Sequence, residues 1–152
     1  MKSLILKTLA TDKSLTEFFL RVALGAMILP HGLQKTFGAF GGYGYTGTMQ
    51  FFTDTMGIPA PFAFMAIAAE FAGGFALILG IGTRWAALLV GAVMAVAALT
   101  SHVQNGFFMN WFGNQKGEGW EFHLLAIAIA VALVVRGGGA YSTDLVVSKK
   151  LS

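Results

Sequence analysis

The sequence predicts an all-α membrane protein, a single domain over residues 1–152 in which four transmembrane helices form a bundle. Two observations of composition and two of pattern predict this class. Hydrophobic residues make up 56% of the chain and charged residues only 11%, whereas a soluble domain carries about 25% charged residues. Four apolar stretches approach the length that crosses a bilayer as helix. No alternating strand pattern repeats along the chain, which favours helices.

The four predicted spans are residues 15–37, 60–80, 85–102 and 120–135. The first follows a lysine-bearing start, but it is longer than the core of a signal peptide and lacks a small-residue cleavage site, so we expect it to be retained. The second begins at Pro59 and Pro61, and the fourth is short. In the glycine-rich connection 38–58, residues 48–56 are predicted to form a short helix at the membrane surface.

Basic residues are concentrated in the two terminal segments and in the connection between the second and third spans. These segments contain Lys2, Lys7, Lys13, Arg84, Arg136, Lys149 and Lys150, whereas the first and third connections contain only Lys35 and Lys116. The positive-inside rule therefore predicts that both termini are cytoplasmic. Because the net charge of +3 is scattered over span ends, we expect membrane lipids as partners and no nucleic acid.

Glu70 is the most informative polar residue, because it lies ten residues into the second span and thus near the bilayer midplane. A carboxylate at that depth is costly and indicates a functional site with a partner. His31 lies about 9 Å below the outer end of the first span, with Gln34 and Lys35 on the same helical face. His102 closes the third span on the same outer side.

Glu121 and His123 open the fourth span, about 200° apart around a helix, so they cannot both face one pocket. We expect Glu121 to face inward and assign no role to His123. The predicted site then has Glu70 as the buried proton acceptor and Arg21 as its electrostatic counterweight. Its ligand-binding residues are Arg21, His31, Gln34, Lys35, His102 and Glu121, flanked by Phe107, Phe108, Trp111 and Trp120.

Several interpretations of these residues stay open. Glu70, protonated or paired with Arg21 or His31, could simply lock the bundle. The polar residues could instead bind a quinone and exchange protons with it. A metal site with His31 and His102 as ligands is less favoured, since no metal-binding spacing occurs. A proton or small-solute pathway ranks lowest, because the chain has no internal repeat.

The chain contains no cysteine, which excludes disulfides, cysteine-bound iron–sulfur clusters and thiolate haem. The sequence gives no indication of haem or flavin either. Any redox work would therefore pass electrons through a bound cofactor or a partner subunit.

An ordered set of motifs resembles the DoxX family of small four-span membrane proteins over about residues 16–144. The set comprises Arg21, residues 31–35 (HGLQK), 70–74 (EFAGG), 79–84 (LGIGTR), His102, residues 119–121 (GWE) and 137–144 (GGGAYSTD). The resemblance implies a bundle in the bacterial inner membrane. Family members are linked to quinone-coupled thiosulfate oxidation, terminal oxidase complexes and oxidative-stress systems.

Together these observations predict an integral inner-membrane subunit of a redox system, with a quinone bound in a polar pocket that opens toward the periplasm. If the protein is an enzyme, we expect a quinone-linked oxidoreductase subunit. The alternative is a non-enzymatic scaffold that anchors soluble oxidoreductases. A soluble oxidoreductase partner and a homo-oligomer are both compatible with the sequence.

Overall fold

The computed structural model describes residues 8–151, and within this range it contains helices and turns but no strand, which confirms the all-α prediction. Lys2 and Lys7 lie outside the described residues. The α-helices are α2 (Leu15–Phe37), α3 (Gly44–Gln50), α4 (Ala60–Leu79), α5 (Thr83–Ala97), α6 (Glu121–Arg136) and α7 (Thr143–Leu151). Four short turns connect or extend them: η1 (Ala39–Gly41), η2 (Phe51–Thr55), η3 (Ala98–His102) and η4 (Val103–Asn105).

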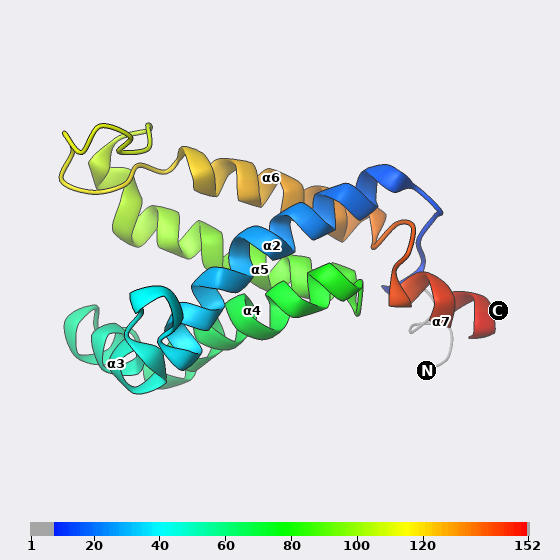
Figure 1. The fold of residues 1–152 in the computed structure, drawn as a ribbon, viewed down its shortest axis with the longest axis horizontal. Helices are drawn as coiled ribbons and strands as arrows, with labels where there is room; N and C mark the ends of the chain where they lie inside the picture. The colour runs from blue at the N-terminus through cyan, green and yellow to red at the C-terminus, as the bar shows by residue number, and fades with distance from the viewer. Residues whose placement is uncertain (1–7, 152) are drawn as a thin grey trace.

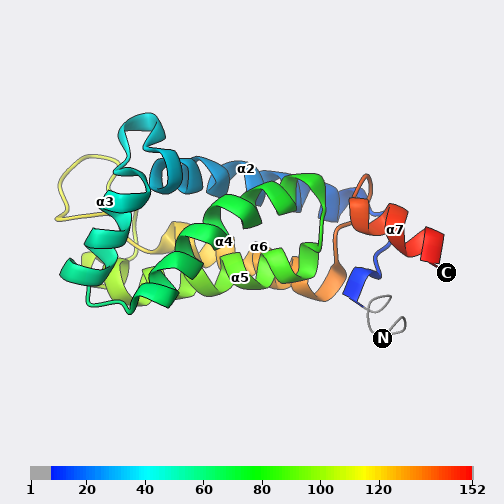
Figure 2. The same ribbon diagram turned by 90° about the horizontal axis from the view of Figure 1, so that it is seen from below.

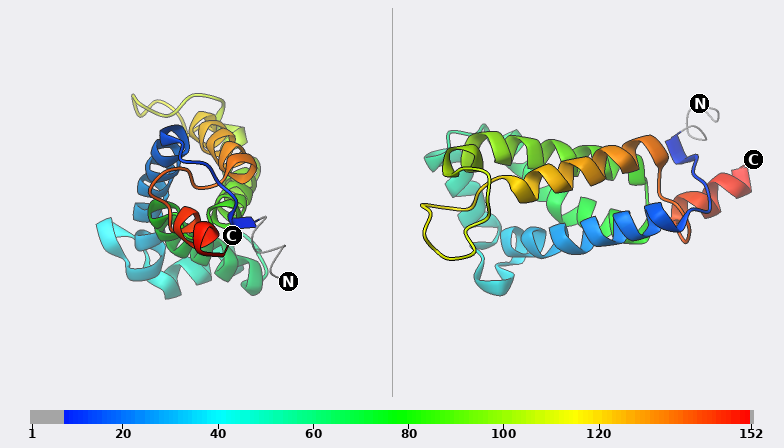
Figure 3. Two further views of the ribbon diagram at one scale, coloured as in Figure 1. Left: turned by 90° about the vertical axis from the view of Figure 1, so that its right-hand side faces the viewer. Right: turned by 90° about the horizontal axis from the view of Figure 1, so that it is seen from above.

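The four long helices lie side by side, with α2 against α4, α4 against α5, α5 against α6 and α6 against α2 (Figures 1 and 2). One end of this arrangement carries α7 and the start of α2. The opposite end carries α3 and the loop of residues 106–120 (Figure 3). A core of aliphatic side chains, among them Leu24, Ile28, Leu77, Val90 and Leu133, fills the space between the long helices.

The ends of the helices follow from local sequence. Ser14 begins α2 by accepting a hydrogen bond from the Thr16 backbone N–H at 3.2 Å. Gly38 ends the helix in the left-handed region at φ 72°, where glycine carries no steric penalty. Pro59 and Pro61 flank the first residue of α4, where a missing N–H costs no helical bond. Gly80 then ends α4 as Gly38 ends α2.

The helix positions agree closely with the predicted ones. Residues 15–37 form α2, residues 60–79 form α4, and residues 121–136 form α6. The predicted third stretch divides into α5 and η3, and the predicted surface helix becomes α3 and η2. At Phe51–Thr55 and at Ala98–His102 the chain is wound more widely than an α-helix, as a π-helical turn.

Two segments in the described part of the chain are long and apolar enough to cross a membrane, Ala60–Leu79 and Thr83–Asn105. Helix α6 has 16 residues and is therefore about 24 Å long, shorter than the hydrocarbon core. Helix α2 is long enough but carries Glu17, Arg21 and Lys35. The four-span topology with cytoplasmic termini thus stays a prediction.

Candidate functional site

A cavity of about 460 Å³, here called the main cavity, lies between α4 and α5 and is closed on one side by η2. Its lining is Lys35, Phe51, Phe52, Met56, Ile58, Phe62, Met65, Ala66, Ala69, Glu70, Leu89, Ala92, Val93, Val96, Ala97, Thr100, Ser101 and His102. Most of these side chains are apolar. The few polar side chains include one cation, Lys35, one carboxylate, Glu70, and one imidazole, His102. This size and composition are typical of small-molecule sites.

Glu70 and Lys35 form an ion pair on the wall of the main cavity. The Lys35 ammonium donates to Glu70 Oε2 at 2.5 Å, and the Glu70 side chain is 6% exposed against 25% for Lys35. Within residues 8–151 the second carboxylate oxygen, Oε1, has no hydrogen-bond partner. The pair therefore keeps donor capacity on Lys35 and acceptor capacity on Glu70 for a further group.

The contact between the two residues depends on a glycine. A Cβ added to Gly32 would lie 2.6 Å from Cα of Phe71 and 2.7 Å from the carbonyl carbon of Glu70. Only a glycine therefore allows α2 to approach α4 at this level. Lys35 follows Gly32 by three residues, on the same side of α2, and so reaches the Glu70 carboxylate.

His102 enters the main cavity from η3. Its Nδ1 lies 3.0 Å from the carbonyl oxygen of Glu118, and since a carbonyl only accepts, Nδ1 carries the proton. In a neutral imidazole the other ring nitrogen, Nε2, is then an acceptor. Thr100 and Ser101 line the cavity from the same turn. A π-helical turn inside a helix is frequent at functional sites, and here it presents three consecutive polar residues.

His123 packs against His102, with ring centroids 4.2 Å apart. It is 7% exposed, and its Nδ1 has no hydrogen-bond partner among the described residues. The expectation that Glu121 rather than His123 faces inward is wrong. Glu121 lies in the first turn of α6 and its Oε1 accepts from the Met109 backbone N–H at 3.0 Å. A carboxylate in a first helical turn often binds backbone N–H groups nearby. The position of Glu121 at the start of a predicted helix was therefore the sequence feature that indicated this contact.

The structure does not bring His31 and Gln34 into the main cavity. His31 is exposed, and its ring lies 6.4 Å from that of Phe122 on α6. The amide of Gln34 donates to the carbonyl of Phe40 at 3.5 Å. Both residues were predicted to share a helical face with Lys35, but of the three only Lys35 lines the main cavity.

Arg21 is not the counterweight of Glu70. It is 1% exposed, and its guanidinium donates to the carbonyls of Leu77, Ile78, Gly138, Ala140 and Tyr141. All five N–H groups are therefore used. Leu77 follows Glu70 by seven residues, or about 10 Å along α4. Arg21 thus holds the C-terminal segment onto the end of α4, which is a structural role.

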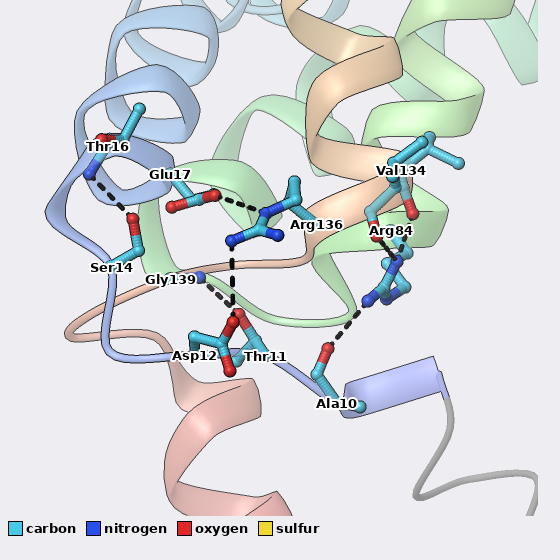
Figure 4. A network of polar contacts seen from close by, with 11 residues as sticks. Ala10, Thr11, Asp12, Ser14, Thr16, Glu17, Arg84, Val134, Arg136 and Gly139 are labelled. Carbon is cyan, nitrogen blue, oxygen red and sulfur yellow. Dashed lines mark hydrogen bonds and ion pairs between the residues drawn. The ribbon is translucent and has the colours of Figure 1, made fainter.

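The same end of the molecule contains a wider polar network (Figure 4). Asp144 accepts from the backbone N–H groups of Gly82 and Thr83 at 2.7 and 2.8 Å, and so caps the start of α5. Arg84 donates to carbonyls at the end of α6 and to Ala10. Arg136 pairs with Glu17 at 3.0 Å. The C-terminal motif 137–144 therefore fastens helix ends together, away from the main cavity.

The aromatic surroundings also differ from the prediction. Phe51, Phe52 and Phe62 line the main cavity, whereas Phe107, Phe108, Trp111 and Trp120 do not.

In the described part of the chain no group of three or more His, Asp or Glu side chains lies close enough to hold a metal ion. The metal interpretation of His31 and His102 therefore gains no support.

Comparison with known proteins identifies the family. The DoxX family model matches residues 17–103, more than half of the chain. The chain belongs to the DoxX family. The matched DoxX region contains all three charged or imidazole residues of the main cavity, Lys35, Glu70 and His102.

Two relatives carry names that bear on location and chemistry. The chain is 32% identical to the Inner membrane protein YqjF of Escherichia coli (strain K12), over 70% of this chain and 77% of that protein. It is 29% identical to the Putative oxidoreductase CatD of Bacillus subtilis (strain 168), over 86% of this chain and 85% of that protein. No solved structure matches this DoxX chain.

Proposed function

We propose that this DoxX protein is a multi-pass inner-membrane subunit of a redox system that binds a quinone ring in the main cavity. The observation that carries the proposal is the Lys35–Glu70 ion pair, which is largely buried on the wall of an otherwise apolar cavity that also contains His102. An ion pair in such a place stabilises a fold poorly, since its desolvation offsets much of the attraction. Its presence is better explained by a ligand with polar groups.

The proposed topology has four spans with both termini in the cytoplasm. Large hydrophobic side chains on the outer faces of the helices support it, such as Phe19 at 64%, Leu99 at 72% and Val135 at 66% exposure. Arg84, Arg136 and the C-terminal lysines lie at the same end of the molecule, as the positive-inside rule requires. The name of the Escherichia coli relative is consistent with this location. The main cavity then opens on the periplasmic half.

The residues of the main cavity suit the chemistry of a quinone. Lys35 donates a hydrogen bond to a ring carbonyl, and Glu70 holds and passes a proton at its Oε1 oxygen. Nε2 of His102 accepts from a hydroxyl of the reduced ring. The phenylalanine and alanine walls exclude water and pack on the ring faces.

A quinone supplies a carrier for two electrons and two protons. The protons pass through Glu70, and the electrons come from a soluble oxidoreductase partner. The oxidoreductase name of the Bacillus subtilis relative is consistent with a redox role.

Equilibrium binding of a short-chain quinone to the purified protein tests the proposal. We expect saturable binding to the wild type and a loss of affinity of about tenfold or more in Glu70→Gln, because the amide cannot balance the charge of Lys35. Glu17→Gln is the matched control, since Glu17 is also a buried, ion-paired carboxylate but lies at the opposite end. Equal affinity of Glu70→Gln and the wild type would remove Glu70 from the site.

A second candidate function is that of an anchor for a soluble oxidoreductase. The loop of residues 106–120 favours it, because Phe108, Trp111 and Phe112 are 67%, 80% and 87% exposed. Aromatic side chains of this kind are enriched in protein interfaces. Retention of an oxidoreductase by the wild type but not by a Trp111→Ser/Phe112→Ser variant, without any quinone binding, would favour the anchor over the redox subunit.

A further inference from the structure

A second hollow, here called the alanine groove, lies between α4 and α5 on the side of the Ile81–Gly82 turn. It has a volume of about 390 Å³ and is lined by apolar residues throughout. Its floor consists of small residues, Ala68, Ala69, Ala72, Gly73 and Ala76. Larger side chains, which include Phe64, Ile81, Trp85 and Leu89, form its walls.

The alanine groove adjoins the main cavity. Met65, Ala69 and Leu89 line both hollows, so the two lie next to each other along α4 and α5. Along α5 and η3 the two together extend from Trp85 to His102, which corresponds to about 25 Å of helix. This length is most of the roughly 30 Å of one hydrocarbon core, and Trp85 lies where a membrane-interface tryptophan is expected.

The two hollows differ in chemistry. The main cavity carries Lys35, Glu70 and His102, whereas the alanine groove offers no charged side chain. A ligand that fills both has a compact polar ring at one end and a long apolar chain at the other. No charged side chain lines the turn end of the groove, which disfavours a phospholipid, whose headgroup would lie there.

We infer that the alanine groove holds the isoprenoid tail of the quinone whose ring occupies the main cavity. This inference rests on the proposed function. It assigns the substrate class of the site as long-chain prenyl quinones and makes α4 and α5 the elements that select tail length. The small residues of α4 set the depth available to the methyl branches of the tail, and burial of each tail carbon strengthens binding.

The test compares a multi-prenyl quinone with the same quinone ring without a tail, in the wild type and in Ala72→Trp. Ala72 is exposed and lines the groove but not the main cavity, so an indole there blocks the tail while the core stays unchanged. We expect affinity for the prenyl quinone to fall by about tenfold or more and affinity for the ring alone to stay the same. Ala128→Trp, on the exposed face of α6, is the matched control and should change neither.

Each outcome has a distinct meaning. If Ala72→Trp binds both quinones like the wild type, the tail lies elsewhere and this inference is overturned while the ring site stands. If Ala72→Trp weakens both equally, the variant has disturbed the main cavity, and Ala76→Leu in the same groove must show the selective loss or the inference fails. If neither quinone binds the wild type, the proposed function fails and the tail site with it.

Discussion

Nζ of Lys35 lies 2.5 Å from Oε2 of Glu70, and this contact joins the end of α2 to the middle of α4. The two residues are brought together by Gly32, which lets the helix backbones approach beside Glu70. Binding and stability at this point are therefore coupled: any change that moves α2 from α4 separates the charges.

Lys35→Met leaves the buried Glu70 carboxylate without its partner. We expect the free energy of unfolding to fall by about 1–3 kcal/mol, because an unpaired buried charge is costly and Lys35 is partly exposed. Denaturant unfolding in detergent micelles measures it. The double variant Lys35→Met/Glu70→Leu removes both charges and should recover most of the loss. A double variant no more stable than Lys35→Met would show that the pair is not the cause.

Gly32→Ala places a Cβ within 2.6 Å of the Phe71 backbone, so α2 and α4 must separate. Overpacking of this kind costs about 1–3 kcal/mol, and we expect quinone binding to fall with it because Lys35 moves from Glu70. Thermal unfolding and ring binding on the same preparation measure the two effects. Ala26→Ser, at an exposed position of α2, is the control. A Gly32→Ala protein with normal stability and normal binding contradicts the close approach of the two helices.

His102→Asn distinguishes the roles of the two nitrogen atoms of the imidazole. The asparagine amide can still donate to the carbonyl of Glu118, as Nδ1 of His102 does, but nothing replaces Nε2 in the cavity. We expect near-normal stability and about tenfold weaker quinone binding. Calorimetric binding and thermal unfolding give both values. Unchanged binding would remove His102 from the list of ligand contacts.

Arg21→Lys tests the structural role of the guanidinium. Lysine has three donors without a planar arrangement, so several of the five carbonyls that Arg21 serves lose their partner. We expect a loss of at least about 3 kcal/mol in the free energy of unfolding. Limited proteolysis should also cut faster near residues 137–141. If Arg21→Lys instead weakens ring binding while stability is kept, the residue belongs to the site after all.

Asp144→Asn weakens the cap of α5, because a neutral amide oxygen replaces the carboxylate that accepts from Gly82 and Thr83. We expect a loss of about 1–2 kcal/mol. Hydrogen exchange should increase at these two amides while the amides around Glu70 stay protected. Exchange that is unchanged at Gly82 and Thr83 would show that the cap contributes no local stability.

Helix positions were predictable from the sequence, whereas the partners of the polar residues were only partly so. The bounds follow from apolar length, prolines and glycines, all of which act locally. The Lys35–Glu70 contact depends on how far α2 slides along α4, which Gly32 and Phe71 decide together. A sequence pattern identifies both residues as unusual, but it contains no information on this register.

The expectations for Arg21 and Glu121 differ from the structure for related reasons. Arg21 was expected to balance a charge, but backbone carbonyls at the end of α4 and in the connection between α6 and α7 need donors, and the guanidinium supplies five. His123 was left without a role because Glu121 was placed inward. In the structure Glu121 binds the adjoining loop, and the imidazole of His123 packs against that of His102. Both errors came from the treatment of helix ends.

Photoaffinity labelling of the membrane-embedded protein with a photoreactive quinone locates the bound ring. We expect the label to map by mass spectrometry to peptides from residues 51–70 and 89–102, and unlabelled quinone to compete for it. Label confined to the loop of residues 106–120 or to the outer face of α6, and insensitive to competing quinone, would contradict a quinone site between α4 and α5.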